Sequence, residues 1–169
     1  MKVLIVSDSH GLTNELEEIV ARHHHEANAL IHCGDSELPF DQKEIARFLV
    51  VRGNCDFTTQ FPNERTEEIE GVRFFITHGH LYNVKTSLMN LYYRAKEVEA
   101  KVVCFGHSHI AGAEMIDGIL FINPGSILLP RARKEKTYAL LQIEDGKATV
   151  QFYELDGKEV ASLTKTFTL

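Results

Sequence analysis

The sequence predicts an α/β domain in which a β-sandwich carries helices on its outside, and three observations support this. Short apolar runs alternate with amphipathic stretches through the N-terminal two thirds of the chain. The C-terminal third instead has short strands joined by tight Asp-Gly turns, which is typical of an antiparallel meander. The chain of 169 residues is 44% hydrophobic, enough to fill one core. We therefore expect residues 1–169 to form a single domain, with the two styles of strand in two packed sheets.

Five apolar runs are expected to be strands, because they are rich in Val, Ile, Leu and Phe, as strands covered on both faces should be. They cover residues 2–7, 29–33, 48–51, 72–77 and 101–105. Between the first two, Asn14 followed by Glu17 predicts a helix start that resembles a capping box. The buried stripe of this helix is expected to hold Leu16, Ile19, Val20 and His23. A second helix is expected over residues 84–99, with Leu88, Leu91, Tyr92 and Ala95 at core spacing.

The C-terminal third has three dipeptides that predict tight turns. Asp and Gly tolerate the positive backbone dihedral angles that a hairpin turn demands. The dipeptides are Asp117-Gly118, Asp145-Gly146 and Asp156-Gly157. Antiparallel strands are therefore expected on either side of each turn.

The charge balance argues against broad electrostatic binding to nucleic acid or to an anionic membrane, since the formal net charge is −6. The small basic cluster of Arg131, Arg133, Lys134 and Lys136 is interpreted as a solvated loop. The sequence has no signal-peptide pattern and no run of about 20 apolar residues that would span a bilayer. Its three cysteines do not suggest a disulfide framework, so a cytoplasmic location is expected.

Each of the five apolar runs ends in residues that can bind a metal ion. Ligands of α/β sheets bind beyond the carboxyl ends of the strands, so these side chains are expected to converge on one crevice. Glycines before three of them allow sharp turns and close backbone approach. In chain order the residues are Asp8 and His10, Asp35, Asn54, His78, and finally His107 and His109.

Any one of these strand endings is a weak signal, but five in one short chain are a strong one. The two-residue spacing of Asp8 and His10, and of His107 and His109, is expected to place both side chains of a pair on one side of an extended segment. The alternative, several buried and unpaired carboxylates and imidazoles, is energetically costly. The three consecutive histidines at 23–25 are instead interpreted as structural, because they lie at the negative end of a predicted helix.

The mixture of imidazole, carboxylate and amide ligands suits divalent manganese, iron, zinc, cobalt or nickel. Two ions about 3.5–4 Å apart can clamp an in-line displacement at phosphorus. Two dications offset by Asp8, Asp35 and a bridging hydroxide leave about one positive charge, which would attract a phosphodiester anion to an acidic protein.

Together these motifs resemble the calcineurin-like metallophosphoesterase superfamily. The short chain and a later Asn-Pro-Gly-Ser segment look like its small bacterial and archaeal phosphodiesterase branch. The motifs are Asp8-Ser9-His10, Gly34-Asp35, Gly53-Asn54-Cys55-Asp56, Thr77-His78-Gly79-His80, Gly106-His107-Ser108-His109 and Asn123-Pro124-Gly125-Ser126. The resemblance implies a four-layer αββα sandwich of two mixed β-sheets flanked by helices.

The resemblance also implies how the ligands divide between two divalent metal ions. Both ions are expected to be manganese. One ion is expected at Asp8, His10, Asp35 and His109, and the other at Asp35, Asn54, His78 and His107. Asp35 would bridge the two ions. A hydroxide bridging them would attack the phosphorus of a small phosphodiester, with Asn54, His78 and His107 as the catalytic residues around it.

The resemblance is incomplete at Cys55, where many members have a histidine that can protonate the leaving oxygen. His80 is a possible substitute or a hydrogen-bonded structural residue, and the sequence does not choose between them. Cys33 and Cys104 are interpreted as small buried hydrophobic residues.

A second class of function must be weighed, because the same fold resembles the retromer subunit, a protein-binding scaffold with a degenerate metal site. Here all seven ligand positions keep metal-competent residues, which favours an enzyme. A homodimer is also expected, since the resembled branch often forms dimers.

Overall fold

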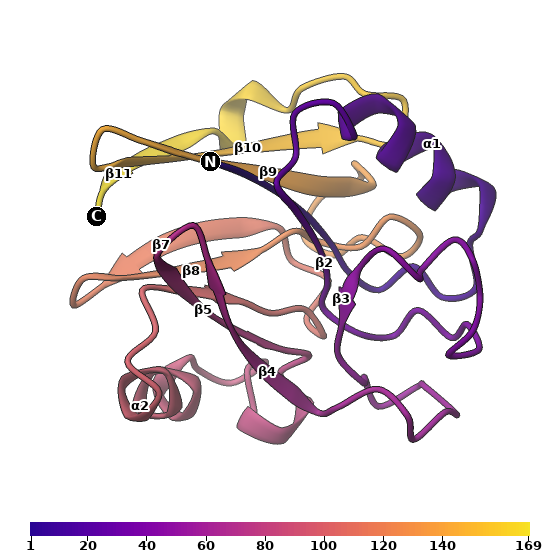
Figure 1. Ribbon diagram of the computed structural model, residues 1–169, viewed down its shortest axis with the longest axis horizontal. Coiled ribbons are helices and arrows are strands. Elements are labelled where there is room, and N and C mark those ends of the chain that lie inside the picture. The colour runs from indigo at the N-terminus through magenta and orange to yellow at the C-terminus, as the bar shows by residue number, and fades with distance from the viewer.

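The computed structural model describes residues 1–169 as two β-sheets packed face to face (Figure 1). The first sheet has six strands, in spatial order β11 (Lys165–Thr168), β10 (Lys147–Glu154), β9 (Thr137–Glu144), β1 (Lys2–Val6), β2 (Ala29–His32) and β3 (Leu49–Val50). The second has five, in order β4 (Glu64–Ile69), β5 (Val72–Thr77), β6 (Val102–Cys104), β8 (Ile119–Asn123) and β7 (Gly112–Ile116).

One α-helix covers the outer face of each sheet, which gives four layers. Helix α1 (Asn14–His23) packs on the six-stranded sheet, and α2 (Met89–Glu97) packs on the five-stranded sheet (Figure 1). Two short 3₁₀ helices, η1 (His80–Tyr82) and η2 (Ala161–Leu163), lie in connections. The predicted αββα sandwich of mixed sheets is confirmed. Neither α-helix is long or apolar enough to cross a membrane.

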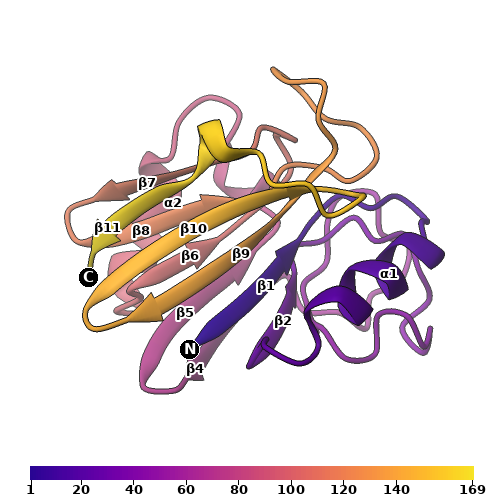
Figure 2. The same cartoon turned by 90° about the horizontal axis from the view of Figure 1, so that it is seen from above.

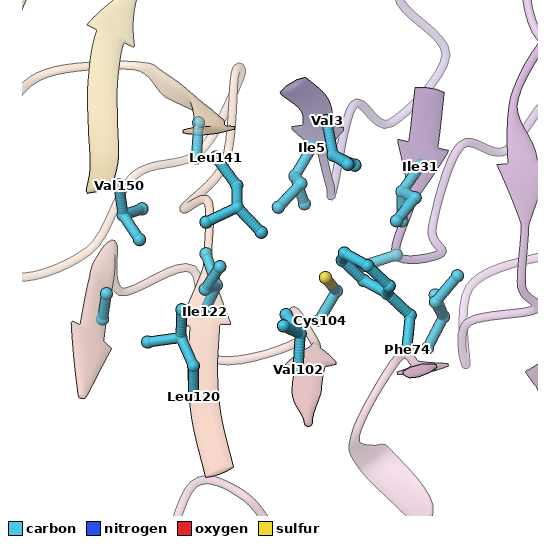
Figure 3. Packing of buried hydrophobic residues seen from close by; sticks show 14 of the residues in the cluster. Val3, Ile5, Ile31, Phe74, Val102, Cys104, Leu120, Ile122, Leu141 and Val150 are labelled. Atoms are coloured by element: carbon cyan, nitrogen blue, oxygen red, sulfur yellow. The ribbon is translucent and has the colours of Figure 1, made fainter. Parts of the chain in front are cut away.

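The main core lies between the two sheets, where 18 buried residues form one cluster. Figure 3 shows Val3, Ile5 and Leu141 of the six-stranded sheet facing Phe74 and Ile122 of the five-stranded sheet. Smaller clusters lie beneath each helix. Because alternate residues of β1 point into different clusters, this strand is buried on both faces, and its continuous apolar sequence follows from that position.

The two styles of strand do not separate into two sheets, so that expectation was wrong. Each sheet has three parallel strands, β1–β2–β3 in one and β5–β6–β8 in the other. The β7–β8 hairpin extends the five-stranded sheet, whereas β9, β10 and β11 extend the six-stranded sheet (Figure 2). The turns at Asp117-Gly118 and Asp145-Gly146 join these antiparallel strands with positive φ at both residues, as predicted.

Helix α1 begins at Asn14 as predicted, but its capping and the start of α2 differ from the predictions. The N-cap of α1 is Thr13, which makes no side-chain capping bond, so the proposed capping box at Asn14 and Glu17 is absent. Helix α2 begins at Met89 instead of residue 84. There the Ser87 hydroxyl accepts the Met89 amide hydrogen, and local bonds of this kind compete with helix formation in the preceding residues.

Strand β4 was missed by the sequence analysis because four of its six residues are charged. It pairs with β5 at the edge of the five-stranded sheet. Charged edge strands are a common protection against edge-to-edge association, and they lack the apolar run that identifies an inner strand.

Candidate metal centre

The loops that follow β1, β2, β3, β5 and β6 meet at one end of the two sheets, because these strands run parallel within each sheet. Backbone hydrogen bonds join neighbouring loops. The amide of Asp8 donates to the Gly34 carbonyl at 3.0 Å, and the amide of His10 donates to the Asp35 carbonyl at 3.0 Å. The amide of Gly106 donates to the His78 carbonyl at 2.9 Å. The predicted convergence of the strand ends is therefore present.

The first group of possible ligands is Asp8, His10 and His109, whose donor atoms lie within 4.8 Å of one another. The His109 Nε2 atom is 3.0 Å from Asp8 Oδ1. The His10 Nε2 atom is 3.8 Å from the same oxygen and 3.5 Å from His109 Nε2. Two imidazole nitrogens thus face one buried carboxylate oxygen.

The second group is Asp8, Asp35 and His78. The His78 Nε2 atom lies 3.2 Å from Asp35 Oδ2 and 3.8 Å from Asp8 Oδ1. The side-chain oxygen of Asn54 is 3.1 Å from the same His78 nitrogen. Donor atoms of Asp35 also lie within 4.8 Å of those of His10, so this carboxylate is within reach of both groups.

His107 and His80 lie beside the second group. The ring centre of His107 is 5.1 Å from that of His78 and 6.0 Å from that of His80. His107 belongs to none of the compact groups of ligand atoms, although its backbone amide donates to Asp8 Oδ2 at 3.1 Å. His80 is half-buried, and its Nδ1 atom is buried without a hydrogen-bond partner.

The backbone of the proposed ligands is mostly left-handed and not extended. The expectation that an extended segment places both side chains of each pair on one side was therefore wrong. Asp8, His10, Asp35, His107 and His109 all have φ between 44° and 68°. Such conformations cost roughly 1 kcal/mol or more each outside glycine, although Asp and His accept them more readily than branched residues. The side chains converge because turns, and not β-strands, carry them.

Two glycines make room for the carboxylates. A Cβ atom at Gly53 would overlap the Asp35 carboxylate, and one at Gly106 would overlap the Ser7 hydroxyl and lie 2.6 Å from Asp8 Oδ2. The glycine before Asn54 and the glycine before His107 are thus required by close approach, as the sequence suggested.

Three imidazoles are oriented by hydrogen bonds on the side that faces away from the centre. Nδ1 of His78 bonds the Cys33 carbonyl at 2.7 Å, and Nδ1 of His109 bonds the Leu129 carbonyl at 2.7 Å. Nδ1 of His10 bonds the Glu37 carboxylate at 2.6 Å. A proton held on Nδ1 leaves the Nε2 lone pair free, which is the arrangement found around metal-bound histidines.

Several residues without a predicted role hold the loops in place. Asp56 accepts hydrogen bonds from the amides of Asp35, Glu37 and Gly53 at 2.7–2.9 Å. The Ser126 hydroxyl donates to the Asp8 carbonyl at 2.7 Å. Asp56 and Ser126 belong to the motifs quoted above, but nothing in their spacing revealed these bonds, and Glu37 carried no signal at all.

Both buried carboxylates are held in the ionised form. Burial opposes ionisation of Asp8, but the adjacent imidazoles of His109 and His78 together keep its pKa below the usual value. Burial likewise opposes ionisation of Asp35, and its interactions with His78 outweigh that effect and lower its pKa strongly. For His107, burial and the nearby His78 and Lys85 lower the pKa to about 4. The centre therefore offers two carboxylates and a neutral imidazole.

One specific observation indicates that these residues fit a metal ion. Asp8 Oδ1 is fully buried and has no hydrogen-bond partner, although three imidazoles lie within 4 Å of it. An ionised oxygen left without a partner in this way is costly, and a bound cation would remove the cost.

The cysteines have different surroundings. Cys33 and Cys104 are fully buried and unpaired, as expected for small hydrophobic residues. Cys55 is exposed, and its backbone amide donates to Asp35 Oδ1 at 2.8 Å. Partial desolvation and the negative charge of the nearby Asp35 carboxylate raise the pKa of the Cys55 thiol to about 11.

A family model described as the calcineurin-like phosphoesterase superfamily domain matches residues 1–146. The chain belongs to the calcineurin-like phosphoesterase superfamily. The resemblance inferred from the motifs is therefore confirmed. Members of this family are metal-binding hydrolases of phosphoesters. Bacillus subtilis has a superfamily relative named probable metallophosphoesterase YsnB, 50% identical over 100% of both chains. A phosphodiesterase of Methanocaldococcus jannaschii is 32% identical, and the match covers 74% of this chain and 83% of the relative.

Two solved structures show the same fold. A Streptococcus pneumoniae protein described as a predicted phosphoesterase superposes with a TM-score of 0.95 and 36% identity, covering 99% of this chain and 97% of that one. Vps29 of Entamoeba histolytica, solved with zinc, has a TM-score of 0.74 at 19% identity and covers 100% of this chain and 98% of that one. At that identity the likeness to Vps29 shows the shared fold alone.

Proposed function

We propose that the chain is a metal-dependent phosphodiesterase whose dinuclear site is formed by Asp8, His10, Asp35, Asn54, His78, His107 and His109. The observation that carries this proposal is the buried Asp8 oxygen without a partner, faced by the Nε2 atoms of three histidines. Asp8, His10 and His109 would hold one ion. Asn54, His78 and His107 would hold the other, with Asp35 shared.

Two divalent ions bound there would supply Lewis acidity at the phosphoryl oxygens and lower the pKa of the attacking water. The chain's own part is to keep the ligands in position. Hydrogen bonds on Nδ1 fix the rings of His10, His78 and His109, while Asp56 fixes the backbone of Asp35. Manganese remains the proposed metal, because oxygen and imidazole ligands predominate and no thiolate is required.

His80 is the proposed proton donor to the leaving oxygen. Its Nδ1 atom is buried without a partner, and its ring stands beside His78 and His107. A proton donor must reach the leaving oxygen with a nitrogen that is not already held in another hydrogen bond. Cys55 is a weaker choice, since a thiol is a poor hydrogen-bond donor.

The protein-binding scaffold is the less favoured function. A scaffold has no need for five left-handed residues that bring carboxylates and imidazoles together, because strained backbone of this kind persists where function requires it. A homodimer and a cytoplasmic location remain predictions from the sequence.

Hydrolysis of bis(p-nitrophenyl) phosphate tests the proposal. The protein is stripped with a chelator, assayed, and assayed again after addition of Mn²⁺, with Mg²⁺ and Zn²⁺ in parallel. We expect no turnover without metal and recovery with manganese. Unchanged turnover after verified removal of metal would contradict a metal-dependent mechanism.

A further inference from the structure

A groove of about 570 Å³ lies beside the candidate metal centre. One wall is the segment from Phe105 to Ala113, which leads from β6 through the two ligand histidines into β7. Residues before α2, including Lys85 and Leu88, also line the groove. Apolar side chains make up much of the remaining lining, among them the exposed Ile110 and small edges of the buried Phe105 and Phe121. The volume lies within the range of small-molecule sites.

The groove and the metal centre share one loop. Ser108 lines the groove and lies between His107 and His109 in the chain. Asn123 lines the groove as well, and its amide donates to the Ser108 hydroxyl at 3.0 Å and to the Gly106 carbonyl at 3.2 Å. The groove therefore begins next to the loop that carries two of the proposed ligands, where an arm of a bound phosphodiester can enter it.

The charges around the groove are mainly positive, in contrast to the chain as a whole with its net charge of −6. Lys85, Arg131 and Lys165 line it, against the single acid Glu114. Lys85 and Arg131 make no salt bridge, so both remain available to an anion. The backbone amide of Arg131 donates to the His109 carbonyl at 3.1 Å. Arg131 thus lies at the end of the groove nearest the metal centre.

We propose that the groove holds one ester arm of the substrate, a nucleoside-sized aromatic group that carries a second phosphate. This inference rests on the proposed phosphodiesterase function and specifies its substrate class. The apolar lining and the volume of the groove suit the faces of a nucleoside base. Lys and Arg side chains without a salt bridge suit a phosphate, to which Arg can donate two hydrogen bonds. A methyl arm is too small and uncharged to use either feature.

Three p-nitrophenyl phosphodiesters test the proposal, because all release the same nitrophenolate when water displaces it from phosphorus. Their second arms are methyl, thymidine, and thymidine with a 3′-phosphate. With the manganese-loaded protein we expect kcat/KM to rise at least tenfold from methyl to thymidine, and about tenfold again with the 3′-phosphate, the size of one charge-assisted contact. Lys85→Gln and Arg131→Gln should each remove most of the second rise. Lys134→Gln, an exposed cation outside the groove, is the matched control.

Equal kcat/KM for the three esters would overturn the groove proposal while leaving the phosphodiesterase function intact. An equal loss of kcat/KM on all three esters in the Lys85 and Arg131 variants would do the same. Failure to hydrolyse even the methyl ester would contradict the proposed function itself. Calorimetric binding of thymidine 3′,5′-bisphosphate gives a second measurement that does not depend on turnover. We expect it to bind about tenfold more weakly to Arg131→Gln than to Lys134→Gln. Equal affinities would count against the groove.

Discussion

The carboxylate of Asp56 accepts the backbone amide hydrogen of Asp35 at 2.9 Å and so fixes the loop that carries the proposed shared ligand. The same carboxylate accepts the amides of Gly53 and Glu37 at 2.7 and 2.8 Å. Three backbone donors on one buried acid tie the loop after β2 to the loop after β3. Asp56 thus positions the centre without contributing a ligand to it.

Asp56→Asn should destabilise the protein and weaken metal binding together. The amide has one acceptor oxygen, so at least one backbone N–H faces an NH₂ group, at a cost of about 2–3 kcal/mol. Loss of a hydrogen bond that supports a ligand typically lowers metal affinity about 10–100-fold. Denaturant unfolding of the metal-free protein and Mn²⁺ titration measure the two effects. The exposed Asp41→Asn is the control, and wild-type values for Asp56→Asn would disprove the role.

Gly53→Ala should abolish metal binding, because its Cβ would overlap the Asp35 carboxylate and displace it. Gly112→Ala is a matched control, since a Cβ there meets no atom within 4 Å. Metal content per chain after dialysis compares the two variants. Full metal content in Gly53→Ala would mean that Asp35 need not occupy its observed position.

Cys55→Ala should hydrolyse the activated aryl diester nearly as well as the wild type. The bond from residue 55 to Asp35 comes from the backbone amide and survives the substitution. Cys55→His should instead raise turnover of unactivated alkyl diesters, because an imidazole is a better proton donor than a thiol. A loss of about 10²–10⁴-fold on alkyl diesters in Cys55→Ala, with metal content intact, would make Cys55 the general acid.

Glu64 of β4 should make stability depend on pH at the acidic end. Partial burial opposes its ionisation, but hydrogen bonds from Arg94 and Tyr82 hold its pKa below the usual 4.5. Its contribution is therefore present above pH 4.5 and is lost as the pH falls through the lower folded-state pKa.

Because Glu64 and Arg94 are about one-third exposed, Glu64→Gln should lower the free energy of unfolding at pH 7 by no more than about 1 kcal/mol. The difference from wild type should shrink below pH 4.5. Urea unfolding at pH 7 and pH 3.5 measures it, with the more exposed Glu68→Gln as control. A difference in the free energy of unfolding that grows at low pH would contradict a stabilising ion pair between Glu64 and Arg94.

Much of the fold could be read from the sequence because buried parallel strands leave continuous apolar runs. Strand β5 begins and ends where predicted, and the other four runs differ by one or two residues at their ends. Strand β4 could not be found in this way, since an edge strand covered with Glu and Arg has no apolar run. The start of α2 depended on the Ser87 hydroxyl, a local bond that helical periodicity does not report.

The convergence of the proposed ligands could be predicted because each of them follows a strand end, but the hydrogen bonds that support them could not. Glu37 reaches His10 across 27 positions of the chain, and Ser126 reaches Asp8 across 118. Such contacts depend on how loops from separate strands meet in space. The left-handed backbone of Asp8 and His10 also replaced the extended geometry that their spacing suggested.

Manganese stoichiometry in the wild type and in Asp35→Asn tests whether the chain holds two ions that share Asp35. Equilibrium titration of the metal-free protein should give two Mn²⁺ ions per wild-type chain. Asp35→Asn should bind no more than one ion tightly, because the substitution removes a shared ligand and its negative charge. Asp41→Asn should bind two ions, as the wild type does. Two ions bound by Asp35→Asn with wild-type affinity, or one ion bound by the wild type, would contradict a dinuclear centre shared through Asp35.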